Sequence, residues 1–347
     1  MSRGIKFIHC ADVHIGAIFS SLGDLAASRR EDVKLAFEKV IGLADEERAD
    51  LLLISGDLCE QEYARKSTLY YLNDQFSKIP STEIFIIPGN HDLELFGRKQ
   101  DFHWSDNVHI LNSHEPSFFL ERLNTQVYSS FGDYHTIDNE RINILLYHGT
   151  VDMNFEDLYN PISSIELKSL GMDYIALGHF HNRIDAIHNP GSLEPLGFDE
   201  EGEHGVYVGT IRKNQPIDVK FQRIARCQYK NLEVSIASLE NLSPLKDPSN
   251  TLVKVVLKGL QGYSIDQAEI RERLGKNLMF LKVSDETLEQ YDFERIKTES
   301  GLKGEFVREM LRQIELVSYP KQKNILTNAL YYGLEALTYG KINPISI

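Results

Sequence analysis

Side chains that suit a pair of divalent metal ions follow five apolar segments of this sequence. Each segment is predicted to be a buried strand, because short apolar runs bounded by turn residues are typical of strands in α/β proteins. Residues directly after such strands gather along one edge of a sheet, where α/β proteins place their sites. The seven candidate ligands are Asp12, His14, Asp57, Asn90, His148, His179 and His181.

The residue types favour manganese, iron or zinc over calcium or magnesium, because Asp and Asn supply hard oxygen and His supplies borderline nitrogen. Two ions about 3.5–4 Å apart can share one carboxylate and one water, lower the pKa of that water and clamp the attacking and leaving oxygens of a phosphate ester. Asp57 is the natural shared carboxylate. Asp12 and His14 are two residues apart on an extended segment, so they point the same way and can share one ion. His179 and His181 have the same spacing.

The elements that would position these ligands are strands separated by helices. Helices are predicted over residues 26–47, 63–76 and 163–171, and the patterns Ser28-x-x-Glu31 and Ser163-x-x-Glu166 resemble capping boxes. Further strands are predicted, with short turns between them, over residues 205–211, 217–223 and 231–236. This order predicts a two-sheet α/β sandwich. The sequence has no Gly-x-Gly-x-x-Gly pattern that would favour a Rossmann domain.

A polar stretch rich in Ser, Pro and Asn, residues 241–250, predicts a linker. The segment after it has the pattern of a small α+β unit, and two helical stretches separated by Pro320 close the chain. The predicted elements there are a strand over 252–257, a helix over 266–274, a strand over 278–283, and helices near 288–316 and 323–339. We therefore expect a catalytic domain over residues 1–239, a small α+β unit over 250–286 and a helical region over 287–347.

The order Asp-x-His, Gly-Asp, Gly-Asn-His-Asp, His and Gly-His-x-His resembles that of the calcineurin-like metallophosphoesterases, over about the first two-thirds of the chain. Within that superfamily, residues 9–16, 176–181 and 190–194 are similar to the SbcD-type DNA repair exonucleases. The resemblance implies two divalent ions, with manganese as the first candidate. It also implies His91 as the acid that protonates the leaving oxygen, oriented by Asp92. One ion would be held by Asp12, His14, Asp57 and His181, and the second by Asp57, Asn90, His148 and His179.

One position departs from the family pattern. Members of that nuclease group often carry a His three residues after the bridging Asp, and this chain has Glu60 there. A carboxylate cannot donate to a phosphate at neutral pH unless it is protonated, so the supporting role of this position is in doubt. The histidines outside the matching segments are expected to be structural. They are His103, His109, His114, His135, His188 and His204.

The resemblance implies a nuclease that hydrolyses DNA phosphodiester bonds by a hydroxide bridging the two ions. Its small α+β unit would be a capping domain that positions DNA, and its final helices would couple to a coiled-coil ATPase of the SbcC type. The expected partners are DNA and such an ATPase, and a homodimer is a further option. Two alternatives stay open, a small-molecule phosphoesterase of the same superfamily and a non-catalytic scaffold of a DNA-repair complex.

The final helices also have an alternative interpretation, in which their apolar faces pack within the chain instead of docking a partner. The residues on those faces are Phe306, Met310, Ile314, Leu326, Leu330 and Leu334.

The charge is divided unevenly along the chain. Residues 1–200 carry 16 Lys+Arg against 32 Asp+Glu, and residues 201–347 carry 21 against 19. An acidic catalytic part would hold a long duplex poorly by phosphate contacts alone, so a partner or the C-terminal part should supply much of the grip. The sequence has neither a long apolar run nor a secretion leader, and its three cysteines are scattered. We therefore expect a cytoplasmic protein that does not contact membranes.

Overall fold

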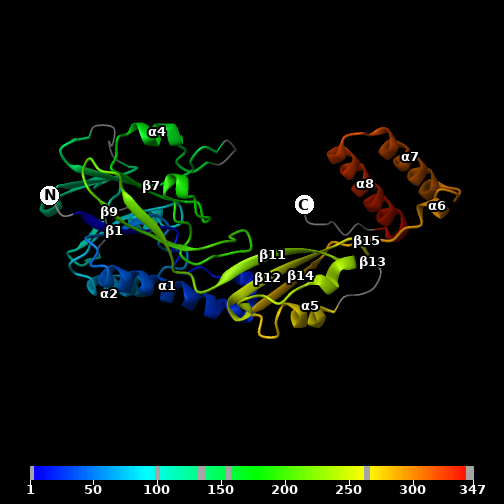
Figure 1. The fold of residues 1–347 in the computed structure, drawn as a ribbon, viewed down its shortest axis with the longest axis horizontal. Coiled ribbons are helices and arrows are strands. Elements are labelled where there is room, and N and C mark those ends of the chain that lie inside the picture. Colours follow the sequence, from blue (N-terminus) through cyan, green and yellow to red (C-terminus); the bar gives the residue numbers. More distant parts are fainter. Residues whose placement is uncertain (1–3, 98–101, 132–136, 154–157, 262–265, 341–347) are drawn as a thin grey trace. The chain divides into compact units, whose positions relative to one another are not determined.

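The computed structural model describes residues 4–97, 102–131, 137–153, 158–261 and 266–340. It divides the chain into two compact units, residues 1–229 and 230–347 (Figure 1). Each unit is described by itself below.

A six-stranded sheet forms one layer of the first unit. Four consecutive strands, counted from one edge of the sheet, are parallel. A fifth strand from later in the chain pairs antiparallel with the last of these four, and a sixth pairs antiparallel with the fifth. Apolar runs such as Leu51–Ser55 are fully buried, as the sequence predicts for inner parallel strands. The order across the sheet is β10 (Asp218–Arg223), β9 (Gly205–Ile211), β1 (Ile5–Cys10), β2 (Leu51–Ser55), β3 (Glu83–Ile87) and β4 (Val108–Ile110).

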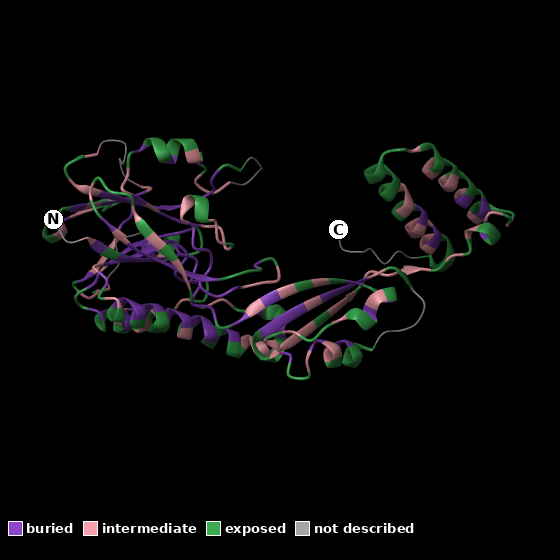
Figure 2. Cartoon of the chain, viewed as in Figure 1, coloured by how far each residue is buried: buried purple, intermediate pink, exposed green. Residues whose placement is uncertain are grey.

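A four-stranded sheet forms the second layer. Its strands lie in the order β5 (Ser117–Leu120), β6 (Thr125–Ser129), β7 (Ile142–His148) and β8 (Tyr174–Gly178), and the last three are parallel. Phe7, Leu53 and Phe85 of the first sheet share one buried core with Leu146 and Tyr174 of the second. The two sheets therefore pack face to face, and the predicted two-sheet α/β sandwich is confirmed. Figure 2 shows buried residues along the inner strands of both sheets.

Helices cover the outer faces of this sandwich. α1 (Ala26–Glu46) and α2 (Lys66–Ser77) meet through Phe37 and Phe76, whose ring centroids are 6.0 Å apart. α4 (Ser164–Ser169) packs Leu167 against β7 and β8, and the Ser163 side chain accepts from the Glu166 amide as its sequence pattern predicts. The remaining short helices of this unit are α3 (Leu93–Phe96), η1 (Ser20–Leu25), η2 (Glu121–Leu123) and η3 (Asp185–Ile187).

The capping box predicted at Ser28 is wrong. The chain enters α1 directly from η1, and the residue before the helix is Leu25, which makes no side-chain cap. The Ala26 amide bonds instead to the Gly23 carbonyl of the preceding turn. Ser28 therefore lies inside the first turn of α1.

The second unit begins with a three-stranded sheet, in the order β11 (Gln228–Ser235), β12 (Thr251–Lys258) and β14 (Phe280–Asp285). α5 (Gln267–Leu274) covers one face through Ile270 and Leu274, which pack against Val253 and Val255. The strand expected over 231–236 is thus β11, and it joins this sheet. The units divide after Tyr229, ten residues before the boundary expected at residue 239. The short elements here are β13 (Leu260–Gln261), β15 (Leu288–Glu289), η4 (Ile236–Asn241) and η5 (Pro248–Asn250).

The helices that close the chain have a core of their own. They are α6 (Phe293–Ile296), α7 (Leu302–Leu316) and α8 (Pro320–Tyr339). Pro320, which was expected to lie between the helices, is the first residue of α8. Ile296, Val307, Leu330 and Leu334 are buried together, and Phe306, Met310 and Ile314 pack on them. Most of the apolar residues that the sequence places on the faces of the final helices therefore pack within this helical group. In the part of the chain that the structure describes, no helix combines the length and apolar character that a membrane crossing requires.

Candidate metal centre

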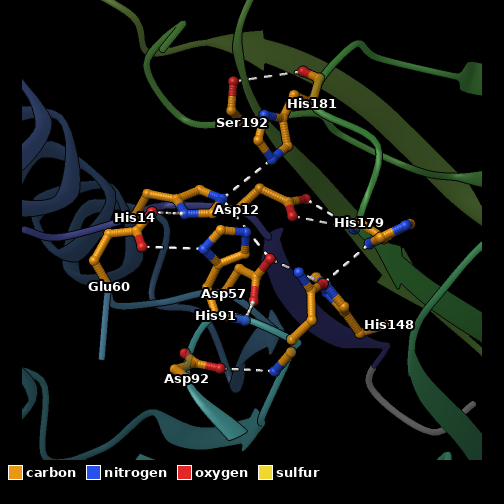
Figure 3. A network of polar contacts seen from close by, with 12 residues as sticks. Asp12, His14, Asp57, Glu60, His91, Asp92, His148, His179, His181 and Ser192 are labelled. Atoms are coloured by element: carbon orange, nitrogen blue, oxygen red, sulfur yellow. Dashed lines mark hydrogen bonds and ion pairs between the residues drawn. The ribbon is translucent and has the colours of Figure 1, made fainter. Parts of the chain in front are cut away.

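The seven candidate ligands meet at the ends of β1, β2, β3, β7 and β8. An unbroken series of contacts joins their polar atoms (Figure 3). It runs from His181 to His14, Asp57, His148, Asn90 and His179, and the His179 amide donates to Asp12 at 3.1 Å. The structure thus brings together every residue that the sequence singled out as a ligand.

One group of ligand atoms belongs to Asp12, His14 and His181, and these atoms lie within 4.8 Å of one another. The Nε2 atoms of the two imidazoles are 3.1 Å apart. Each ring directs its Nδ1 at a carboxylate 2.8 Å away, Glu60 for His14 and Glu200 for His181. In the neutral form of each ring, Nδ1–H donates to the carboxylate and Nε2 carries the lone pair, so both Nε2 atoms are placed to bind one cation. A divalent ion fits this arrangement.

A second group surrounds the Asn90 side chain. Its Oδ1 lies 3.1 Å from Nε2 of His148 and 3.2 Å from Nδ1 of His179. The other ring nitrogen of His148, Nδ1, donates to the Ser55 carbonyl at 2.8 Å, which leaves Nε2 as the ligand atom. An amide oxygen and two imidazole nitrogens at such distances also suit a divalent cation.

Asp57 stands between the two groups. Its Oδ2 is 3.2 Å from Nε2 of His148 and 3.8 Å from Nε2 of His14. Its Oδ1 accepts a hydrogen bond from the His91 amide at 2.8 Å, which fixes the direction of the carboxylate. One carboxylate therefore faces both groups of ligand atoms, as the shared ligand of an ion pair must.

The backbone at the ligands is strained. Asp12, His14 and Asp57 have φ of 50°, 51° and 50°, and His179 has φ of 99°. A non-glycine residue in a sparsely populated backbone region costs about 1–3 kcal/mol, and such residues cluster at functional sites. The His14 amide donates to the Asp57 carbonyl at 2.9 Å, which holds the first two ligand loops together.

Two glycines of the motifs, Gly56 and Gly89, lie so close to ligand side chains that no side chain of their own would fit. A Cβ on Gly56 would overlap the His148 ring, and a Cβ on Gly89 would overlap the Asp57 carboxylate. The glycines that precede Asp57 and Asn90 in the sequence therefore leave the space in which the ligands converge.

The negative charges of the site favour protonation of two of the ligand histidines, His148 and His181. Burial opposes the charged form of His148, but the hydrogen bond and negative charge of Asp57 outweigh it and raise the pKa to about 9. Burial is likewise outweighed at His181, where Glu200 and Asp12 raise the pKa to about 9. Burial and the neighbouring His148 lower the pKa of His179 to about 4. A metal ion would take the place of the protons on the first two rings, because only neutral imidazole is a ligand.

The prediction that Asp92 orients the His91 ring is wrong. Nδ1 of His91 contacts Oε2 of Glu60 at 3.0 Å, and the His91 side chain is 43% exposed. The Asp92 oxygens accept instead from the amides of Gly89 and Leu58, each at 2.7 Å. At the turn after β3 the two adjacent side chains point apart. Asp92 therefore joins the loops that carry Asp57 and Asn90, and Glu60 orients the His91 ring.

Sequence reasoning missed the carboxylates behind the ligands. Glu200 lies in the acidic stretch 199–203, which is typical of a solvated surface, and no motif marks it. Glu60 stands at the position where the family pattern is broken, and that break was the only available signal. His204 is buried and bonds to Ser192 and to the Glu200 carbonyl, whereas His109 contacts Glu83. His135 lies outside the described residues.

Comparison with known proteins identifies the family of this chain. A family model described as calcineurin-like phosphoesterase matches residues 5–183. The uncharacterized metallophosphoesterase YhaO of Bacillus subtilis (strain 168) is 28% identical over 299 residues, 75% of this chain and 73% of that protein. The DNA double-strand break repair protein Mre11 of Methanopyrus kandleri is 25% identical over 273 residues, and a subunit of the nuclease SbcCD from Staphylococcus epidermidis is 27% identical over 270 residues. These matches cover 66% and 62% of this chain and 57% and 69% of the two relatives. Because the family model spans more than half of the sequence, the chain belongs to the calcineurin-like phosphoesterases.

Proposed function

We propose that this chain is a binuclear-metal phosphodiesterase that hydrolyses DNA phosphodiester bonds and uses manganese. Family membership supports the general class, a metal-dependent phosphoesterase. The observation that carries the binuclear assignment is the Asp57 carboxylate, whose Oδ2 lies 3.2 Å from His148 and 3.8 Å from His14. The proposed ligands of one ion are Asp12, His14, Asp57 and His181, and those of the other are Asp57, Asn90, His148 and His179.

Divalent ions bound there would act as Lewis acids on the phosphate and activate water as the nucleophile. The protein itself supplies position and a proton. The His91 amide holds Asp57 in its shared orientation. The hydrogen bond from Nδ1–H to the Glu60 carboxylate raises the pKa of His91 and favours its imidazolium form, whose Nε2–H can protonate the leaving oxygen.

The names of two relatives, a DNA double-strand break repair protein and a nuclease, favour DNA as the substrate. The charge of the first unit limits how DNA can be held. Residues 1–229 carry 21 Lys+Arg against 35 Asp+Glu, while residues 230–347 carry 16 of each. We infer that the α+β part of the second unit caps DNA, and that a basic partner such as an SbcC-type ATPase, docked through the final helices, completes the grip. The expected compartment is the cytoplasm.

The same acidity favours a second candidate function, hydrolysis of small phosphoesters, because a small substrate needs no extended basic surface. A manganese-supplemented assay separates the candidates by comparing labelled duplex DNA, single-stranded DNA and bis-p-nitrophenyl phosphate, with Asp57→Asn as the control. Cleavage of DNA by the wild-type chain that is lost in Asp57→Asn is the expected result. Hydrolysis of the small diester without any DNA cleavage would favour the second candidate, and no hydrolysis at all would favour a scaffold.

A further inference from the structure

The two proposed ion sites differ in the groups that lie behind their histidines. We call the group formed by Asp12, His14 and His181 site A, and the group formed by Asn90, His148 and His179 site B, with Asp57 shared. The difference concerns the ring nitrogen that does not face the ion, because its hydrogen-bond partner sets the basicity and orientation of the imidazole.

Glu200 lies behind His181 in site A. Its side chain is only 5% exposed, and one oxygen accepts from Nδ1 of His181 at 2.8 Å. The other oxygen accepts from the Ser192 hydroxyl at 2.7 Å and from the Leu196 amide at 3.0 Å. The carboxylate is therefore buried and fixed at both oxygens, and its charge is directed at the ligand.

Glu60 lies behind His14 in the same site, at 2.8 Å from Nδ1. Its side chain is 18% exposed, and its second oxygen contacts the His91 ring. Both imidazoles of site A are therefore held by carboxylates, in addition to the charges of Asp12 and Asp57 themselves.

In site B the group behind His148 is neutral. Nδ1 of His148, the nitrogen that does not face the ion, is held by the Ser55 carbonyl at 2.8 Å. Two other carboxylates lie near this site: Asp92, whose oxygens bind the amides of Gly89 and Leu58, and Asp12, whose oxygen lies within 4.8 Å of a ring nitrogen of His148. The shared Asp57 is thus the carboxylate that contacts an imidazole of site B.

We propose that site A binds its ion first and more tightly, with Glu60 and Glu200 as positioning residues, and that the ion of site B is the exchangeable one. This inference rests on the proposed binuclear function. It follows from charge and basicity, because carboxylate partners strengthen imidazole ligands and removal of such a partner typically weakens metal binding about 10–100-fold. The free metal concentration then decides what fraction of chains holds both ions and can react.

The test is a manganese titration of the metal-free chain, followed by calorimetry and by electron paramagnetic resonance, which separates isolated from coupled Mn²⁺. The wild-type chain should show a first step at least about tenfold tighter than the second, with isolated Mn²⁺ giving way to a coupled pair. Glu200→Gln keeps the hydrogen-bonding shape but removes the charge, so the first step should weaken about 10–100-fold and approach the second.

Glu83→Gln is the matched control. Glu83 accepts from the His109 ring at 2.8 Å, a carboxylate–histidine pair of the same length outside the metal centre. This variant should retain both steps unchanged. If Glu200→Gln does not fold, as circular dichroism of the metal-free protein would reveal, Glu60→Gln carries the same test because its side chain is partly exposed.

Two steps of equal affinity in the wild-type chain, or a first step unchanged in the folded variant, would overturn the inference while leaving the binuclear function intact. A wild-type chain that binds fewer than two Mn²⁺ ions would instead defeat the proposed function itself.

Discussion

His91→Ala should remove the proton donor without disturbing the metal ligands. The His91 ring contacts Glu60 at 3.0 Å and is 43% exposed, whereas the contact with Asp57 comes from the His91 backbone amide, which alanine retains. Metal content should therefore stay near that of the wild-type chain. A positioned acid contributes about 10²–10⁴-fold to the rate. At 1.36 kcal/mol per decade this loss equals roughly 2.7–5.4 kcal/mol of barrier.

The size of the loss should depend on the leaving group. A p-nitrophenolate leaves without a proton, so the variant should lose little activity on an activated diester and most of its activity on DNA or on an alkyl diester. The assay is a series of manganese-loaded turnover measurements over leaving groups of increasing pKa. His114→Ala, which removes another exposed histidine, is the control and should match the wild-type chain throughout. Equal losses on activated and unactivated esters would refute the assignment of His91 as the acid.

Three further predictions concern pH, packing and domain organisation. Because His148 and His181 have pKa values raised from 6.5 to about 9, their contribution to the stability of the metal-free chain is complete below pH 6.5 and is lost as the pH rises through 9. Manganese binding in this window should release protons, as calorimetry in buffers of different ionisation enthalpy will measure. Gly56→Ala should displace the His148 ring and lower manganese affinity, whereas Gly42→Ala, which has open space, should not. Deletion of the residues after Thr287 should leave a folded chain, since the core of α6–α8 lies wholly within residues 291–334. This truncated chain should hydrolyse an activated ester but no longer bind an SbcC-type ATPase. A folded truncation that still co-purifies with the ATPase would place the docking surface elsewhere.

The ligand set and the layered fold could be predicted from the sequence because both depend on local patterns. Asp57, Asn90 and His148 each stand at the end of an apolar run, and parallel strands bring such ends to one edge. The small α+β unit and the final helices were likewise visible as alternating or helical apolar spacing.

The failures share one cause, since each depended on contacts between segments far apart in the sequence. Periodicity identifies the strand β11 but not its partner β12, so the boundary between the units was expected too late. Glu200 reaches His181 only after the chain folds back through residues 182–199, and nothing local separates it from its acidic neighbours. The family resemblance implied that Asp92 orients His91, but the fold turns Asp92 toward the backbone amides of Gly89 in its own loop and of Leu58 in the loop after β2.

The most direct test of the central claim is the manganese stoichiometry of Asp57→Asn compared with His14→Ala. If one carboxylate serves both ions, Asp57→Asn should weaken both sites and abolish the coupled Mn²⁺ signal, whereas His14→Ala should chiefly weaken one site and leave one ion bound. Elemental analysis and electron paramagnetic resonance after manganese loading measure both outcomes. An Asp57→Asn chain that retains two Mn²⁺ ions at wild-type affinity would contradict the account.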